Sequence, residues 1–387
     1  MDKPLKLMLV AGEASGDKAA SSLIKEIKEH HSNLSIIGIA GSNCIREGLT
    51  SIYSLNKISV MGFFEVITSI KHILQAMATC KHKLRTYKPD YLILVDYPSF
   101  NLRLAKYAKK LDIPVFYYIS PKVWAWKQSR INLIQKHVSH MAVILPFEVP
   151  IYQKKAIPVT LVTHPSLGYS KATKTKINTC NSYNIDPDKQ IICLMPGSRI
   201  SEIKYNFPTI IEACELLLQK NCNYQFILPV ASTIDITQIK KYIPHELFTH
   251  ITLIPNDQYN AIDASDMVIA VSGTATLEVS LMQKPLCVIY KTSTINYAIA
   301  KRVLLIPYIS LCNLVVDENI VTELIQHDAS AQNIAAWAQS IESNVTVKNN
   351  LIANLAKVRR VLTNNNSAIS AGQCFLDLLS RQSSSRT

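Results

Sequence analysis

Two glycine-bearing turns in the second half of the chain constrain its fold more than any other feature. Residues 196–199 and 272–274 each follow a short apolar run typical of a buried strand, and each precedes a segment with helical periodicity. A helix that begins directly after such a turn offers free N–H groups and the positive end of its dipole to an anion. The pair therefore predicts an α/β sheet that binds a phosphorylated ligand at the ends of two strands.

Two charged side chains make the prediction of the ligand more specific. The guanidinium group of Arg199, in the first turn, has a shape that suits phosphate oxygens. Glu278 follows Gly273 by about one helical turn, so that its carboxylate is placed to accept hydrogen bonds from two ribose hydroxyls. Together they predict a nucleoside diphosphate, with its phosphates at the first turn and its sugar at the second.

The alternation of apolar strands and helices predicts a mainly parallel, doubly wound sheet in each half of the chain. A chain of 387 residues is too long for one ordinary core, which also favours two domains. We expect domains at 1–167 and 168–362, with a polar linker at 168–189, and a C-terminal helix within 363–387 followed by a disordered tail from residue 380.

The predicted strands are 5–11, 35–40, 91–95, 114–119, 141–145 and 159–162, and then 191–195, 225–229, 251–254, 267–271 and 286–290. The predicted helices are 18–29, 102–111, 206–220 and 332–362, with a last one that ends near residue 379.

Composition narrows the class of protein. No run of about 18 apolar residues is present and the N-terminus lacks the layout of a signal peptide, so we expect neither a membrane-spanning helix nor secretion. Nine cysteines without a CxxC pair indicate reduced thiols in the cytosol, and neither a zinc site nor a disulfide framework. The net charge of +13 fits phosphorylated substrates, an anionic membrane surface or simple solubility. Nucleic acid is the weakest partner, because no nucleic-acid-binding motif is present.

Candidate residues also follow the strands of the first half. Asp96 ends the predicted strand 91–95, where a carboxylate serves equally well as a general base or as a turn residue. The turn at 12–17 carries Glu13 and Ser15, and it fits a ligand contact as well as a cap of the next helix by Ser15 or Asp17.

Two further strand ends carry aromatic and imidazole side chains. His164 follows the strand 159–162, where a histidine is more often structural than a phosphate-binding or orienting group. Trp124 and Trp126 form either a rigid wall of a binding site or ordinary packing under a loop.

The segment 61–74 has an apolar helical face with basic residues nearby, and this pattern fits two environments. Packing against a protein core is the usual interpretation of such a face. Lying in a membrane interface is the alternative. The residues of this face are Met61, Phe63, Phe64, Ile67, Ile70 and Leu74.

Eight motifs in one order resemble the bacterial lipid-A-disaccharide synthase family of GT-B glycosyltransferases. The resemblance covers nearly the whole chain. Its motifs, besides the turn at 12–17, lie at 60–62, 96–101, 120–126, 145–148, 164–165, 196–199, 272–278 and 310–314. The family differs from this chain at Thr163, where it usually has glycine, and at Gly168, where aspartate often stands.

The resemblance implies two Rossmann-like domains that face a central cleft, with the C-terminal helix returning to the first domain. It implies inverting transfer of a sugar from UDP-2,3-diacylglucosamine to 2,3-diacylglucosamine 1-phosphate, which gives a β-1,6-linked disaccharide 1-phosphate and UDP. Neither a metal nor a cofactor is implied. A UDP-N-acetylglucosamine 2-epimerase, another GT-B enzyme of UDP-sugars, is the nearest alternative, and a non-catalytic binding protein with this fold is a second.

The resemblance also assigns roles to residues. Asp96 would be the base for the 6-hydroxyl of the acceptor. Glu13, Ser15 and His164 would contact the acceptor or its loops. The nucleotide-sugar would be held by Ser198, Arg199, Ser272, Gly273, Thr274, Glu278 and Asn313.

Because the implied substrates are acylated, the membrane interface becomes the better interpretation of the segment 61–74. Its apolar face would contact the inner membrane from the cytoplasmic side, so the protein is expected to be cytoplasmic and peripheral. Some members of the family exchange C-terminal segments in a dimer, so this chain is also expected to form a homodimer.

Overall fold

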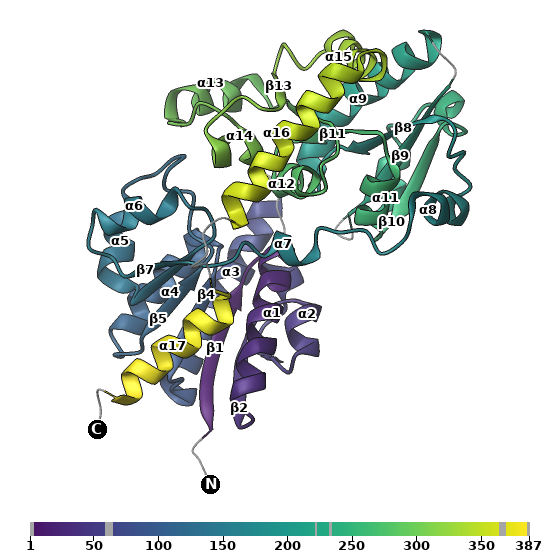
Figure 1. Cartoon of the computed structure of the whole chain (residues 1–387). Coiled ribbons are helices and arrows are strands. Elements are labelled where there is room, and N and C mark those ends of the chain that lie inside the picture. Colours follow the sequence, from purple (N-terminus) through teal and green to yellow (C-terminus); the bar gives the residue numbers. More distant parts are fainter. Residues whose placement is uncertain (1–3, 59–64, 221–222, 232–233, 364–368, 385–387) are drawn as a thin grey trace. The chain divides into compact units, whose positions relative to one another are not determined.

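The computed structural model describes residues 4–58, 65–220, 223–231, 234–363 and 369–384 (Figure 1). The chain forms two compact units. The first comprises Met1–Pro165 together with Asn365–Thr387, and the second is Ser166–Asn364. Each unit contains one parallel sheet, and the described strands of both sheets confirm the α/β class.

The first sheet has seven strands in the order β3-β2-β1-β4-β5-β6-β7, all parallel. The strand order reverses between β1 and β4, which makes this pair the topological switch point, where ligands bind in open α/β sheets. The strands are β1 (Leu5–Ala11), β2 (Leu34–Ile39), β3 (Thr50–Ser51), β4 (Tyr91–Val95), β5 (Val115–Tyr118), β6 (His140–Val143) and β7 (Val159–Leu161).

Helices cover both faces of the first sheet. In β1, Met8 and Val10 belong to one apolar cluster, whereas Leu7 and Leu9 belong to another on the opposite face. Burial on both faces explains why the strand is apolar without alternation. The helices of this unit are α1 (Ala14–His30), α2 (Ser42–Arg46), the 3₁₀ helix η1 (Leu55–Lys57), α3 (Glu65–Tyr87), α4 (Pro98–Lys109), α5 (Arg130–His137), α6 (Glu148–Gln153) and α17 (Ala371–Ser384).

The C-terminal helix α17 returns to the first unit, as predicted, and packs against α1. Its Phe375 is fully buried and meets the rings of Tyr91 and Phe116 edge-on, with ring centroids 5.1 and 5.3 Å away. Just before the helix, the carbonyl of Ile369 accepts a hydrogen bond from the N–H of Thr163 at 2.9 Å. The prediction of a disordered tail from residue 380 is wrong for residues 380–384, which continue α17 without a glycine or proline to end it, and residues 385–387 lie outside the described part of the chain.

The second sheet has six parallel strands in the order β10-β9-β8-β11-β12-β13. Its order reverses between β8 and β11, the switch point of this unit. The strands are β8 (Gln190–Met195), β9 (Tyr224–Val230), β10 (Ile251–Pro255), β11 (Met267–Val271), β12 (Leu286–Tyr290) and β13 (Thr322–Ile325). Because β13 is short and only partly apolar, its pattern did not predict a strand.

The segment expected to be a polar linker is partly helical, which corrects that prediction. Helix α8 lies within it, begins after a cap in which Thr175 accepts from the N–H of Asn178, and packs on α11. The Lys176 ammonium also pairs with Asp266 at 3.0 Å. The helices of this unit are α7 (Ser166–Tyr169), α8 (Lys176–Tyr183), α9 (Ile200–Lys220), α10 (Ile236–Lys240), η2 (His245–Leu247), α11 (Gln258–Ala264), α12 (Thr274–Leu281), α13 (Thr294–Val303), α14 (Leu311–Val316), α15 (Ala331–Ser343) and α16 (Val345–Thr363).

Three helices begin at least four residues earlier than their periodicity predicted. Helix α4 starts at Pro98, four residues before the expected start. Helix α1 starts at Ala14, four residues before the expected start, and α9 starts at Ile200, six residues before it. Both starts lie within a few residues of a switch-point strand. The free N–H groups of both helices therefore lie at the strand ends where the candidate residues were predicted.

Candidate functional site

The turn after β8 brings an anion-binding arrangement to the switch point of the second sheet. Gly197 has a φ of +117°, and a Cβ there would come within 2.6 Å of the side chain of Glu202. Only glycine fits this conformation and this close approach. Ser198 and Arg199 follow it, and both are exposed.

The carboxylate of Glu202 shows what this turn can hold. One of its oxygens accepts from the N–H of Ser198 at 2.9 Å, and the other from Nη1 of Arg199 at 3.1 Å. A backbone donor and a guanidinium therefore converge on one anionic group. Phosphate oxygens can take the same two donors.

The turn after β11 lies beside it, because β8 and β11 are paired neighbours. The hydroxyl of Ser272 donates to the carbonyl of Ile309 at 2.7 Å and ties down the loop before α14. Gly273 has an extended backbone that any residue adopts, so the turn does not need glycine for its conformation. Thr274 is exposed at the first position of α12.

Glu278 lies on α12 among polar groups from distant parts of the chain. Its side chain is buried, and Oε2 accepts from Nε2 of Gln258 at 3.0 Å. Burial, and then the Glu278 carboxylate, raise the pKa of Tyr169 to about 12 and raise that of Tyr259 as well. The sequence did not point to these three neighbours, since only the fold brings them to Glu278.

Asn313 lies in the same unit, but its amide is occupied by protein groups. Its Oδ1 accepts from the N–H groups of Ile320 and Val321 at 2.9 and 3.0 Å, and its Nδ2 donates to Glu323 at 2.8 Å. The side chain is fully buried. Asn313 therefore fixes the loop between α14 and β13, and a direct contact with a nucleotide stays a prediction.

Asp96 follows β4 at the switch point of the first sheet, in an unusual backbone conformation. Asp96 and Tyr97 have φ angles of 47° and 46°, in the left-handed region that costs about 1–3 kcal/mol for each such residue. The Asp96 carbonyl accepts from Nδ2 of Asn101 at 2.8 Å and from the hydroxyl of Tyr117 at 2.6 Å. Its N–H donates to the carbonyl of Tyr118 at 3.0 Å. These bonds hold the left-handed turn in place.

Glu13 lies next to this turn. A Cβ on Gly12 would come within 2.2 Å of the Tyr97 ring, so the glycine allows Tyr97 to pack against the end of β1. Burial, and then the Glu13 carboxylate, raise the pKa of Tyr97. The structure thus brings Glu13 to the turn that holds Asp96, while Ser15 is exposed on the first turn of α1.

Asp17 caps a different helix from the one expected. Its carboxylate accepts from the N–H groups of Gly41, Asn43 and Cys44 at 2.8, 3.0 and 3.1 Å, at the start of α2. The N-cap of α1 itself makes no side-chain capping bond. The prediction that Asp17 or Ser15 caps α1 is therefore wrong, because Asp17 already lies inside α1 and faces α2.

His164 is buried after β7, and its burial lowers its pKa to about 4. The imidazole is therefore neutral near pH 7 and does not provide a cation for a phosphate. Its predicted part in contacts with the acceptor or its loop remains a prediction, limited to hydrogen bonding.

The two tryptophans after β5 have different surroundings. Trp124 donates from Nε1 to Glu148 at 3.1 Å and meets the ring of Phe147 edge-on. Trp126 is 37% exposed, with the ammonium of Lys127 4.4 Å from its ring. Trp124 thus belongs to the packing of the loop, and only Trp126 lies at the surface.

Glu148 makes the stability of the protein depend on pH. Its carboxyl is buried at the start of α6, and burial raises its pKa from 4.5 to about 7 against the hydrogen bonds from Trp124 and Leu145. Between these values the unfolded chain is ionised while the folded chain keeps the proton. We therefore expect the free energy of unfolding to fall as pH rises from about 4.5 to 7, by at most about 3 kcal/mol.

Replacing the carboxyl tests this expectation. Glu148→Gln removes this contribution, so urea unfolding followed by tryptophan fluorescence should show a shallower pH dependence over this interval. Glu29→Gln, at an exposed position of α1, should leave the slope unchanged. An unchanged slope in Glu148→Gln would contradict the assignment.

The predicted membrane-contact face is described only in part. Met61, Phe63 and Phe64 lie outside the described residues, as does the side chain of Ile67. Ile70 and Leu74 on α3 are 48% and 62% exposed, whereas the later part of this helix enters the core through Ala76, Cys80 and Leu84. The first half of α3 thus carries apolar side chains at the surface.

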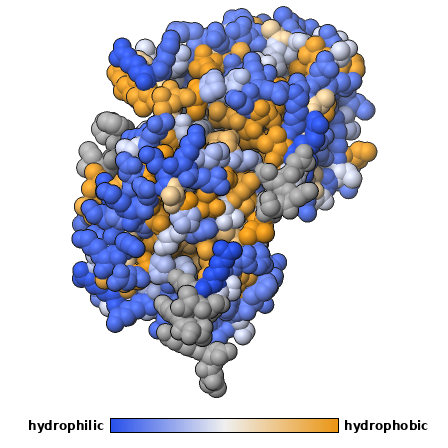
Figure 2. Space-filling model, turned by 60° about the vertical axis from the view of Figure 1, so that its left-hand side comes forward, coloured by the Kyte–Doolittle hydropathy of each residue, from blue (hydrophilic) through white to orange (hydrophobic). Residues whose placement is uncertain are grey.

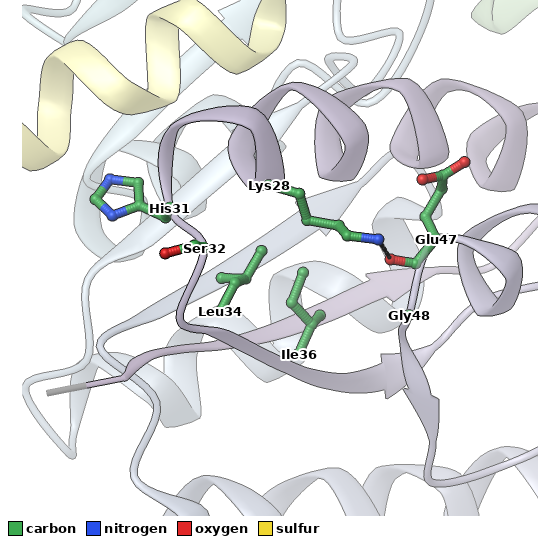
Figure 3. A pocket seen from close by; sticks show the side chains of 7 residues that line it. All are labelled: Lys28, His31, Ser32, Leu34, Ile36, Glu47 and Gly48. Atoms are coloured by element: carbon green, nitrogen blue, oxygen red, sulfur yellow. Dashed lines mark hydrogen bonds between the residues drawn. The ribbon is translucent and has the colours of Figure 1, made fainter. Parts of the chain in front are cut away.

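Two surface pockets lie away from the candidate residues. One of about 120 Å³ lies between the end of α1 and the first residues of β2, where the Lys28 ammonium donates to the carbonyl of Glu47 at 2.9 Å (Figure 3). The other, of about 450 Å³, lies beside residues that precede β4 and β5. Both are at the amino ends of strands, opposite the edge where ligands bind in such sheets.

Two features are absent from the described residues. No group of three or more His, Cys, Asp or Glu side chains in that part of the chain is arranged to hold a metal ion. None of its helices is both long enough and apolar enough to cross a bilayer.

Comparison with known proteins supplies the family. The sequence profile of the lipid-A-disaccharide synthetase family matches residues 7–374. Lipid-A-disaccharide synthase 1 of Legionella pneumophila (strain Lens) is 38% identical over 364 residues, which cover 94% of each chain.

Two solved structures share the fold at low identity. UDP-GlcNAc 2-epimerase from Neisseria meningitidis, bound to UDP-GlcNAc, has a TM-score of 0.66 at 14% identity and covers 97% of this chain and 100% of its own. The calicheamicin glycosyltransferase CalG4 has a TM-score of 0.56 at 10% identity, with 93% and 95% covered.

The structural neighbours identify the fold as GT-B. The sequence relatives separate this chain from the epimerases, which match it in fold alone. On the match along nearly its whole length, the chain belongs to the lipid-A-disaccharide synthetase family of glycosyltransferases.

Proposed function

We propose that this enzyme transfers the sugar of UDP-2,3-diacylglucosamine to the 6-hydroxyl of 2,3-diacylglucosamine 1-phosphate. The products are the lipid A disaccharide 1-phosphate and UDP. One observation supports this above the others. The candidate catalytic and ligand-contact residues other than His164 and Asn313 follow the four strands that form the two switch points, β1 and β4 in one sheet and β8 and β11 in the other.

The second unit supplies the groups for the donor. Arg199 and the N–H of Ser198 would bind the pyrophosphate in place of Glu202, and they would stabilise the charge that develops on UDP as it leaves. Glu278 would accept from the ribose hydroxyls. Its Oε2 accepts from Gln258 at 3.0 Å, so a hydroxyl would take the place of this donor or use the other oxygen.

Asp96 would take the proton from the 6-hydroxyl of the acceptor. The oxygen then attacks the anomeric carbon, the bond from that carbon to the UDP oxygen breaks, and the configuration inverts. The strained turn and its hydrogen bonds from Asn101 and Tyr117 support this role, because they hold the backbone of Asp96 in a single conformation.

The acylated substrates imply work at a membrane surface. We propose that the protein binds the cytoplasmic face of the inner membrane through the start of α3, where Ile70 and Leu74 are exposed and Lys71 is a neighbouring cation. A homodimer remains a prediction from the resemblance.

The test is product analysis with both lipid substrates. The full-length protein should form the disaccharide 1-phosphate and release one UDP for each disaccharide, as measured by mass spectrometry and nucleotide chromatography. UDP-N-acetylglucosamine alone should stay unchanged, since an epimerase would convert it. Protein that binds UDP but forms no disaccharide would refute the proposal.

A further inference from the structure

Helix α13 carries the densest group of exposed apolar side chains in the described part of the chain. The helix buries none of its residues. The group continues past its end, and its exposed fractions are Ile295 74%, Ile299 56%, Val303 45%, Leu304 37% and Leu305 62%. The other large apolar side chains that are exposed among the described residues lie singly or in pairs, which is normal for a protein surface. Five such side chains within residues 295–305 indicate an interaction surface.

The helical geometry puts the three members of this group that belong to α13 on one face. Ile295, Ile299 and Val303 are spaced by four residues, so they lie one above another along α13. Arg302 lies on the same face, whereas Lys301 is turned about 100° away from Arg302 around the helix, and both are exposed. A long cationic side chain in an apolar face can lay its methylene groups along that face while its charge stays in water.

The charged residues around α13 indicate what kind of partner this face binds. Residues 291–310 contain Lys291, Lys301 and Arg302 but no aspartate or glutamate. An apolar face that carries Arg302, with Lys301 on the flank of the helix and no carboxylate, complements an anionic phospholipid surface, where headgroup phosphates lie above acyl chains. Figure 1 labels α13 in the second unit, and Figure 2 shows apolar residues lying among hydrophilic ones on the face of the molecule that it draws.

We propose that α13, with Leu304 and Leu305, is a membrane-contact surface of the second unit that inserts into the headgroup layer of anionic phospholipids. It is distinct from the start of α3, which belongs to the first unit. The inference rests on the proposed function for the presence of a bilayer. It adds that the nucleotide-binding unit itself binds the membrane.

Removal of the apolar side chains is the first test. Ile295→Ser combined with Ile299→Ser should lower binding of the full chain to phosphatidylcholine vesicles that contain phosphatidylglycerol by about tenfold in a sedimentation assay. Ile177→Ser is the matched control, because Ile177 is 62% exposed on α8 of the same unit, and it should bind as the wild type does. UDP affinity and melting temperature should be unchanged in both variants.

Removal of the charges is the second test. Lys301→Gln combined with Arg302→Gln should lower binding to the anionic vesicles by about tenfold and leave binding to pure phosphatidylcholine vesicles unchanged. The adjacent exposed pair Lys240 and Lys241, at the end of α10, provides the control for net charge. Lys240→Gln with Lys241→Gln should bind both kinds of vesicle as the wild type does.

Two results would overturn the inference. One is vesicle binding by the Ile295→Ser, Ile299→Ser variant equal to that of the wild type. The other is a change of this variant from dimer to monomer in lipid-free sedimentation, which would assign the face to a second copy of the chain. Failure of the proposed function is separate, since it would appear as absence of turnover with detergent-dispersed substrates while vesicle binding persists.

Discussion

Asp96→Asn is expected to lower kcat by about 10²–10⁴-fold, the usual contribution of a general base, while the dissociation constant of UDP stays unchanged. Asparagine keeps the size of the side chain and tolerates the left-handed backbone at φ 47°, so the turn should retain its hydrogen bonds from Asn101 and Tyr117. What is lost is the ability to take a proton from the acceptor hydroxyl. Steady-state kinetics with both lipid substrates, together with calorimetric titration of UDP, measure the two quantities.

Asp112→Asn is the matched control for this experiment. Asp112 is also an aspartate with a left-handed backbone, at φ 54°, but it precedes β5 and so lies at the amino ends of the strands. Its substitution should leave kcat unchanged. A kcat for Asp96→Asn within about threefold of the wild type would remove Asp96 from the role of base.

Arg199→Ala is expected to weaken UDP binding by about 10–100-fold, because two or more charge-assisted hydrogen bonds to phosphate are lost. A further loss in kcat, giving about 10²–10³-fold in kcat/KM, follows if the guanidinium also stabilises the leaving UDP. The ion pair with Glu202 is exposed on the arginine side, so its loss should change the free energy of unfolding by less than about 1 kcal/mol. Calorimetric titration and initial rates separate binding from catalysis.

Two variants decide how Arg199 acts. Arg199→Lys should fall between the wild type and Arg199→Ala, because an ammonium keeps the charge but not the planar pair of donors. Lys204→Ala removes the same charge from an exposed position farther along α9 and should leave UDP affinity nearly unchanged. Equal losses in Lys204→Ala and Arg199→Ala would mean that only the general electrostatic field matters, and that Arg199 does not contact the phosphates.

Several features of this protein were predictable from local sequence. Strands such as β4 and β11 are buried on both faces, and the continuous apolar runs in their sequences predict them. Asp96, Gly197 and Gly273 come directly after such runs, and the carboxyl ends of parallel strands form one edge of a sheet. For the same reason, the order of motifs along the chain was enough to indicate the family, which the comparisons then showed.

Other features depend on contacts that no local pattern encodes. Asp17 caps α2 rather than its own helix, and the α8 helix forms in a stretch whose polarity suggested a linker. Gln258 reaches Glu278 from another helix. Asn313 turned out to be enclosed by its own loop. The contacts of Asp17, α8 and Gln258 join residues far apart in the chain, which come close only after the sheets have assembled, whereas Asn313 bonds within its own loop.

The sequence by itself determined the α/β class, the strand ends that carry the candidate residues, and the family, because periodicity and short motifs are local properties. Only the tertiary structure decided which groups hold those residues in place and which apolar faces stay at the surface. The later half of α3 enters the core through Ala76, Cys80 and Leu84, whereas α13 buries no residue. A helix of either kind has the same pattern in sequence, and what packs against it is settled only when the rest of the chain has folded.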